Sequence, residues 1–217
     1  MPRATWTNLD SDRRERVLAA AMAEFGRHGY SGGSLNVIAR EAGVAKGSLF
    51  QYFDDKFDFF AHVAEFTSLR VYAAMAPFLD ATDDVPFAQR MRELVGIWMT
   101  YMAEHPLERG VTAATTMELD PEVRLAVRAP THRLYAQGLR PMLTNAVERG
   151  ELPADLDIDA MLSMLVLLLP HLALAPFEPG LDAGLVLHGT AGAERQSAAA
   201  RLLDTLFATS TIGAPLA

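Results

Sequence analysis

Apolar residues recur three and four positions apart along most of the chain, which is the spacing of an amphipathic α-helix. The first such stripe lies within residues 13–28 and predicts a helix there. Its apolar positions are Val17, Leu18, Ala21, Met22 and Phe25. Asp10 or Ser11 can cap the amino end of this helix, and Gly29 can end it. Residues 31–33 then predict a loop.

Two short helices, 34–42 and 45–53, are predicted next, with a tight turn between them. Gly43 can adopt the positive φ that such a turn needs, and Val44 fills the angle between the helices. Ala39 is small, so the two helices can approach closely. The residues expected to face inward are Leu35, Ile38, Ala39, Ala42, Leu49, Phe50 and Phe53.

Prolines and capping residues divide the rest of the chain into further predicted helices. Asp84 and Asp157 are the expected caps of two of them, and Pro77 is expected to end an earlier one. Pro130 and Pro141 are expected to interrupt a long later helix. The predicted ranges are 54–76, 84–105, 106–116, 121–149, 158–175 and 191–208. No long alternating pattern typical of a β-strand occurs, so the predicted fold class is all-α.

The most apolar segment, residues 160–177, is the best candidate for a membrane span. It contains Ser163, Pro170 and His171 and has acidic flanks, whereas a spanning helix needs about 20 apolar residues. We therefore expect a buried helix and no membrane association. The amino-terminal residues show no secretory signal pattern, which favours a cytoplasmic location.

Charge is distributed unevenly along the chain, whose formal net charge is -8. Acidic and basic residues balance within residues 1–60, so all the excess acid lies later. The two lysines of the chain, Lys46 and Lys56, both lie in the neutral part. This asymmetry predicts two regions with different partners. Cysteine is absent, which excludes disulfides, thiolate metal ligands and a cysteine nucleophile.

The second short helix carries a face suited to a DNA groove. Its expected outward residues are Ala45, Lys46, Gly47, Ser48, Gln51 and Tyr52. Small residues permit close approach to the duplex, Lys46 and Tyr52 can contact phosphates or base edges, and Gln51 can hydrogen-bond adenine. The small-residue spacing alone occurs in many helical hairpins. The spacing, the inward pattern and the outward chemistry together predict a DNA-binding helix-turn-helix.

Residues 13–60 resemble the DNA-binding domain of the TetR (tetracycline-repressor-like) family of transcriptional regulators. The stretches that carry the resemblance are RRERVLAAAMAEFGRHGY, SLNVIAREAGVAKGSLFQYF and DDKFDFF. It implies a helix-turn-helix DNA-binding domain at residues 1–55 and a helical ligand-binding and dimerisation domain at residues 56–217. The implied DNA-binding residues are Ser34, Ala45, Lys46, Gly47, Ser48, Gln51, Tyr52 and Lys56. Phe50 stands where the family commonly has Tyr, and Ala45 replaces a frequent Ser.

A short recognition helix contacts few base pairs, so we expect a homodimer on a palindromic operator in double-stranded DNA. The resemblance implies a four-helix interface formed by residues 158–175 and 191–208 of each subunit. The first of these helices is too apolar to have a solvent face. It can alternatively be the central helix of a monomer. Arg3, before the first helix, can add a DNA contact.

The resemblance implies a ligand cavity in the later region, and methionines and aromatic residues at helical spacing there can line a cavity for a medium-sized apolar effector. The candidate ligand-binding residues are Trp98, Tyr101, Met102, His105, Met117, His132, Tyr135, Met161, Met164 and His171. Each of them singly is also explained by core packing. The histidines lack a second ligand at metal spacing, so no metal site and no cofactor are predicted.

These patterns favour a ligand-responsive transcriptional regulator, most commonly a repressor in this family. No phosphate loop, nucleophile elbow or zinc-protease motif occurs, so an enzyme is not expected. The competing hypothesis is an all-helical carrier or small enzyme that uses the later cavity. A regulator that has lost its ligand response is the third possibility.

Overall fold

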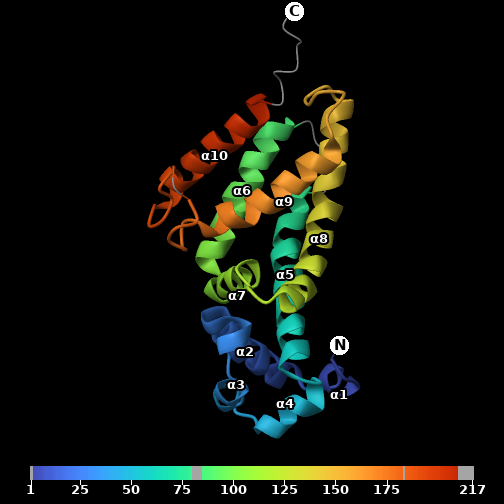
Figure 1. Ribbon diagram of the computed structural model, residues 1–217, viewed down its shortest axis with the longest axis vertical. Coiled ribbons are helices and arrows are strands. Elements are labelled where there is room, and N and C mark those ends of the chain that lie inside the picture. The colour runs from blue at the N-terminus through green and yellow to red at the C-terminus, as the bar shows by residue number, and fades with distance from the viewer. Residues whose placement is uncertain (1, 80–84, 183, 210–217) are drawn as a thin grey trace, which may run out of the picture. The chain divides into compact units, whose positions relative to one another are not determined.

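The computed structural model describes residues 2–79, 85–182 and 184–209, and within these ranges the chain forms helices and no β-strand (Figure 1). The predicted all-α fold is thus confirmed. The helices are α1 (Ala4–Thr7), α2 (Ser11–Gly32), α3 (Leu35–Glu41), α4 (Lys46–Tyr52), α5 (Lys56–Leu79), α6 (Phe87–Glu104), α7 (Pro106–Thr116), α8 (Pro121–Glu148), α9 (Ile158–Leu174) and α10 (Gly192–Thr209). None of these described helices is both long and apolar enough to traverse a bilayer.

Aspartate side chains cap two helices as the sequence predicts. The Asp10 carboxylate accepts a hydrogen bond from the Arg13 N–H at 3.1 Å, at the start of α2. The Asp157 carboxylate accepts one from the Ala160 N–H at 2.9 Å, at the start of α9. Each bond satisfies a backbone donor that has no partner within the helix. Asp84, the predicted cap of α6, lies outside the described residues.

The predicted stop at Gly29 is confirmed by its φ of 65°, which interrupts the helical geometry of α2. A short helical turn then continues to Gly32, where a loop was predicted. Gly150, with a φ of 71°, follows the end of α8. Positive φ is accessible to glycine without the strain that a Cβ atom would cause.

The predicted breaks at three prolines are wrong. α5 continues through Pro77 to Leu79, and α8 is helical throughout, including Pro130 and Pro141. An internal proline removes one backbone donor and costs on the order of 3 kcal/mol. Packing of α8 offsets this cost. Val127 and Leu143, which are near Pro130 and Pro141 in the sequence, are buried apolar residues of the same helix.

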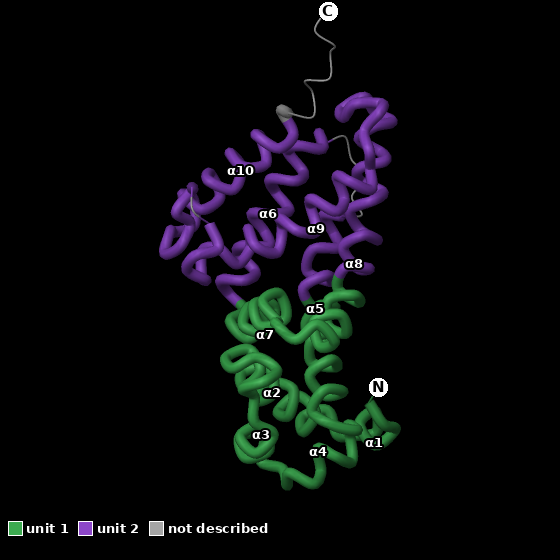
Figure 2. Tube along the Cα trace, viewed as in Figure 1, with its two compact units in different colours: residues 1–70, 105–131 green, residues 71–104, 132–217 purple. Residues whose placement is uncertain are grey.

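The chain divides into two compact units, shown in different colours in Figure 2. Unit 1 comprises residues 1–70 and 105–131, and unit 2 comprises residues 71–104 and 132–217. Each unit has its own core of buried apolar side chains. The unit boundary falls inside α5 and again inside α8. The predicted boundary between a DNA-binding and a ligand-binding domain at residue 55 concerns function, not packing, and stays a prediction.

Within unit 1, the packing of α2 on α7 brings two backbones into contact. A Cβ atom added to Gly26 would lie 2.9 Å from the carbonyl carbon of Gly110, closer than real Cβ contacts occur. Next to this contact in sequence, the buried Glu108 of α7 pairs with Arg70 of α5 at 3.2 Å. The amino-terminal helices, α7 and the first part of α5 therefore form one packed body.

Candidate nucleic-acid interface

Helices α3 and α4 form the predicted helix-turn-helix. The Ser34 hydroxyl accepts a hydrogen bond from the Val37 N–H at 3.5 Å, and the Ser34 N–H donates to Glu24 Oε1 at 2.9 Å. Gly43 has a φ of 67°, and the Val44 N–H donates to the Ala39 carbonyl at 2.9 Å. The positive φ predicted for Gly43 is confirmed, and the Val44 side chain is partly buried against the core of unit 1.

Aromatic rings pack against the buried side of α4. Leu49, Tyr52 and Phe53 are buried, with Phe53 stacked on Phe59 at a centroid distance of 4.3 Å. Trp6 packs against Tyr52 at 5.6 Å and against Phe53 at 5.0 Å. These contacts fix the orientation of α4 within unit 1, so its outer face is held in one geometry.

Two side chains of α4 lie opposite to their predicted sides. Phe50 was predicted to be buried and is 41% exposed, whereas Tyr52 was predicted to face outward and is only 5% exposed. The inward positions of α4 are 49, 52 and 53, which lie three and four residues apart. Phe50 therefore joins Lys46, Gly47 and Gln51 on the exposed stripe.

The outward placement of the other predicted α4 residues is confirmed in most cases. Ala45, Lys46, Gly47 and Gln51 are exposed, and Ser48 is half-buried. The stripe offers a cation, a position without a side chain, an amide and an aromatic ring. This combination can contact phosphates, approach the duplex closely, hydrogen-bond a base and pack on a thymine methyl group.

The amino-terminal arm, residues 3–7, fastens the carboxyl end of α4, which sequence reasoning did not predict. The Arg3 guanidinium donates to Asp54 Oδ1 at 2.6 Å and to the Phe50 carbonyl at 2.9 Å. The Thr5 hydroxyl donates to the Gln51 carbonyl. Arg3, expected as a possible DNA contact, thus neutralises a carboxylate and caps α4.

Lys56, the other predicted DNA contact of this region, is engaged with the end of α2. Its ammonium donates to the Ser31 carbonyl at 3.1 Å and lies 5.0 Å from the centre of the Tyr30 ring. Burial, followed by the negative charge of Asp55, raises the pKa of Tyr30 above its usual value. The Lys56 charge is therefore held beside α2 and is less free than that of Lys46.

The residues predicted to bind a ligand do not line one cavity. Trp98 and Tyr135 meet edge to face at 5.4 Å and border a small cavity of about 30 Å³. Tyr101 lines a separate open groove. Met102 and Met161 are buried in the core of unit 2.

The remaining predicted ligand residues are more widely dispersed. Met117 and Met164 are 43% and 45% exposed. His105 and Met117 belong to unit 1, whereas His132 belongs to unit 2. No group of three potential metal ligands gathers within the described part of the chain.

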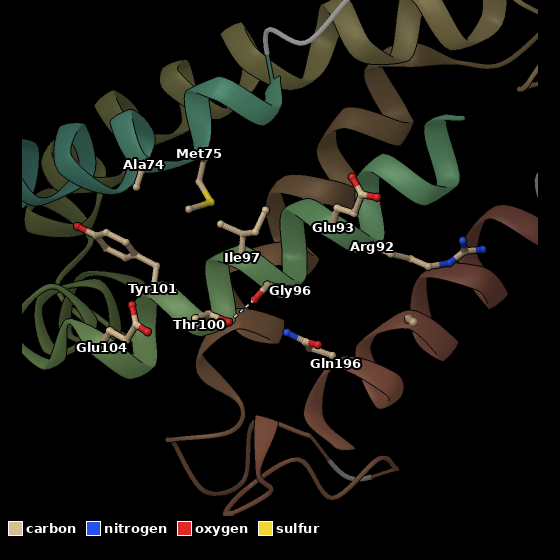
Figure 3. A pocket seen from close by; sticks show the side chains of 11 residues that line it. Ala74, Met75, Arg92, Glu93, Gly96, Ile97, Thr100, Tyr101, Glu104 and Gln196 are labelled. Atoms are coloured by element: carbon tan, nitrogen blue, oxygen red, sulfur yellow. Dashed lines mark hydrogen bonds between the residues drawn. The ribbon is translucent and has the colours of Figure 1, made fainter. Parts of the chain in front are cut away.

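The open groove of unit 2 has a volume of about 650 Å³, which is in the range of small-molecule sites. One face of α6 forms its floor, and residues of α5 and α10 flank it (Figure 3). Its lining residues are Ala74, Met75, Arg92, Glu93, Gly96, Ile97, Thr100, Tyr101, Glu104, Gln196 and Ala200. Most of these residues were not predicted as ligand contacts, because they are not the large apolar residues that the sequence singled out.

In the single chain α9 has an exposed apolar side, so the predicted absence of a solvent face requires a partner and stays a prediction. Leu167 is 67% exposed, and Met164 and Ala160 are exposed on the same side. These positions lie at i, i+4 and i+7, which makes one continuous stripe. His171 follows on this stripe, and its Nδ1 lies 2.7 Å from the Leu167 carbonyl oxygen. Exposed apolar stripes of this kind mark surfaces that a partner covers.

α10 also presents apolar residues outward. Leu203 and Phe207 are buried, whereas Leu202 and Leu206 line an open groove of about 450 Å³ together with Leu185. The two helices predicted to form a dimer interface thus both leave apolar side chains partly uncovered in the single chain.

Two family profiles match the chain in sequence order. Residues 17–63 match the profile described as bacterial regulatory proteins of the tetR family. Residues 81–188 match the profile described as the tetracyclin repressor-like C-terminal domain. The first match contains the whole helix-turn-helix, and the second contains most of unit 2 except α10.

Two curated transcriptional regulators are similar to this chain over different shares of its length. The HTH-type transcriptional regulator SrpR of Pseudomonas putida is 26% identical over 156 residues, which cover 70% of this chain and 70% of SrpR. The HTH-type transcriptional repressor SCO4008 of Streptomyces coelicolor is 32% identical over 93 residues, covering 43% and 44% of the two chains.

Among solved structures, the transcriptional regulator FadR of Bacillus subtilis, in complex with stearoyl-CoA, matches with a TM-score of 0.71. The match covers 89% of this chain and 97% of FadR at 16% sequence identity. At this identity the likeness shows a shared fold.

Proposed function

The chain belongs to the TetR family of transcriptional regulators and is not an enzyme, and from that premise we propose a homodimeric repressor released from its operator by a small effector. The observation that carries the proposal is the exposed stripe of α4, held by a buried aromatic core. Residues 1–55 would contact DNA, and residues 56–217 would dimerise and bind the effector. Such a role implies a cytoplasmic location, where bacterial DNA lies.

The α4 stripe gives each subunit a small set of operator contacts. We assign Lys46 to phosphate or a guanine edge, Gln51 to adenine and Phe50 to a thymine methyl group or a deoxyribose. Gly47 and Ala45 allow the backbone to approach the groove, and Ser34, Ser48 and Lys56 stay candidate phosphate contacts. Tyr52 contributes to the support of α4, because its ring is buried against Trp6.

A helix of seven residues contacts only a few base pairs, so two copies are needed for a specific site. The exposed stripes of α9 and α10 supply a surface that a second copy would cover. A two-fold dimer places two equal half-sites about one helical turn apart, or a multiple of it, which requires a palindromic operator.

The effector would act by preferring one state of the dimer. A ligand releases DNA only if it binds the DNA-incompetent state more tightly than the competent one. The groove on α6 offers an apolar floor for such a ligand. That the FadR neighbour was solved with stearoyl-CoA supports an effector with a large apolar part.

Footprinting of DNA upstream of the protein's own gene and of neighbouring genes tests this proposal. We expect one protected palindrome whose half-sites are centred about one DNA turn apart. Affinity should fall steeply as salt rises, because binding releases counterions from the phosphates. A chain that protects no site, or whose affinity does not change with salt, would contradict the proposal.

Replacing Leu167 with aspartate is expected to dissociate the dimer. The substitution places a charge in the centre of the exposed stripe of α9, where burial in an interface would leave it without a partner. Light scattering at micromolar concentration should give the 23.7 kDa mass of one chain for this variant and twice that mass for the wild type.

The matched control for this substitution is Leu119→Asp. Leu119 is 88% exposed and lies in unit 1, away from α9 and α10 in the sequence and outside their packed unit. This variant should remain a dimer. A dimeric Leu167→Asp variant, or a monomeric wild type, would be inconsistent with the proposed interface.

A further inference from the structure

We infer that the groove on α6 binds an amphipathic organic cation, a molecule with an apolar body and a protonated or quaternary nitrogen. The inference rests on the proposed function and deepens it by naming the chemical class of the effector. It is carried by the shape of the groove, by its apolar floor and by the charges that remain unbalanced along its rim.

The groove is a single continuous surface of unit 2. Its α6 residues lie at positions 92, 93, 96, 97, 100, 101 and 104, which share one helical face. Position 96 borders α10, since a Cβ atom built on Gly96 would lie 3.7 Å from the Gln196 amide, an ordinary van der Waals contact. The resulting volume of about 650 Å³ suits a molecule of drug size.

The floor of the groove is apolar and contains one aromatic ring. Met75 and Ile97 face each other across it, and Ala74 and Tyr101 lie further along the same side (Figure 3). Thioether and aliphatic groups accept apolar ligands of varied shape, because methionine adapts to irregular space. The Tyr101 ring adds a surface that attracts cations through its π electrons.

The charge of the rim is negative. Arg92 pairs with Asp204 of α10 at 2.6 Å, so its positive charge is compensated within the structure. Glu93 accepts a hydrogen bond from the neutral Gln89 amide at 2.9 Å, which leaves its charge in place. Glu104 is exposed at the other end of the groove, beside Tyr101 (Figure 3). The rim therefore carries two carboxylates without a compensating lining cation.

This charge pattern selects between effectors of similar size. A cation can place its nitrogen between the Glu104 carboxylate and the Tyr101 ring while its apolar body covers Ile97 and Met75. An anionic amphiphile would bring like charge to the same rim, which costs free energy. A phosphorylated thioester such as the stearoyl-CoA bound by FadR is therefore a poor match for this groove.

Calorimetric titration with two ions of nearly equal size and opposite charge tests the inference. We expect tetraphenylphosphonium to bind the wild-type protein and tetraphenylborate to bind more weakly. In the double variant Glu93→Gln/Glu104→Gln, tetraphenylphosphonium affinity should fall about fivefold or more, and the preference over tetraphenylborate should shrink. The exposed Glu148 of α8 gives the matched control, because Glu148→Gln changes net charge equally and should leave both affinities unchanged.

Operator binding by the same proteins separates this inference from the proposed function. The double variant should bind the operator as the wild type does, since neither glutamate lies on unit 1. If the wild type binds operator and the cation shows no preference or no dependence on the two glutamates, the inference is overturned alone. If the cation binds as expected and no operator is found, the proposed function is overturned and the cation site stands.

Discussion

Replacing Lys46 with alanine is expected to weaken specific operator binding strongly and to leave the helical fold intact. Lys46 is exposed at the first residue of α4, and a dimer presents it twice. Removing a phosphate contact from each half-site should reduce the slope of log affinity against log salt by about 2. Affinity should fall at least about tenfold, which fluorescence anisotropy with an operator fragment measures across about 50 to 200 mM salt.

The other lysine of the chain supplies the matched control. Lys56→Ala removes the same charge, but the Lys56 ammonium is held by the Ser31 carbonyl and the Tyr30 ring. We therefore expect a smaller loss of affinity from Lys56→Ala than from Lys46→Ala. Equal operator affinity of Lys46→Ala and wild type would contradict the assignment of α4 as the recognition helix.

The helices themselves could be predicted from the sequence because their signals are local. Asp10, Gly29, Gly43 and Asp157 act on the backbone within four residues, so their roles follow from chemistry that neighbouring positions supply. The prolines of α8 were misjudged because their cost is local while the packing that offsets it is tertiary. Spacing along one helix does not show which residues from distant segments pack against it.

The side chains of α4 show how far periodicity reaches at the candidate site. The spacing of Leu49 and Phe53 defines the inward side of α4. In a helix of only seven residues, spacing alone does not decide whether a residue beside that side faces inward or outward. Trp6 settles the ambiguity, because its ring packs on Tyr52 and draws that side into the core. The arm that carries Trp6 has no apolar periodicity of its own, so its contact with Tyr52 could not be predicted from spacing.

The ligand-binding residues could not be predicted from the types of side chain. Helical spacing identifies which residues share a face, but a face can meet another helix or border a groove. Met102 and Met161 became core, whereas Thr100 and Gln196 became groove lining. The groove exists because α5 and α10 flank α6, and that arrangement depends on contacts between segments distant in the sequence.

Replacing Trp6 with alanine is expected to destabilise unit 1 by about 3–5 kcal/mol, the usual cost of removing a large buried aromatic side chain. Trp6 is 3% exposed and contacts Tyr52, Phe53 and His62. Urea unfolding followed by circular dichroism measures the change. Operator affinity should fall as well, because Tyr52 and Phe53, which support α4, would lose their contact with the Trp6 ring.

The same variant should alter the pH dependence of stability through His62. Burial lowers the pKa of His62 in the folded protein, so the unfolded chain binds the proton more tightly. Stability is therefore full above the unfolded pKa of about 6.5 and falls as the pH drops below it. Trp6→Ala opens the surroundings of His62, so its pKa should rise toward that value and this loss of stability should shrink.

Trp6→Phe distinguishes the role of the ring from that of the arm as a whole. A phenylalanine retains an aromatic contact with Phe53, while the Arg3 contacts to Asp54 and to the Phe50 carbonyl are untouched by either substitution. We expect Trp6→Phe to unfold at a urea concentration between those of Trp6→Ala and the wild type, with operator affinity following the same order. Unfolding of Trp6→Ala at the wild-type concentration would mean that the polar contacts of Arg3 alone fasten the arm to α4.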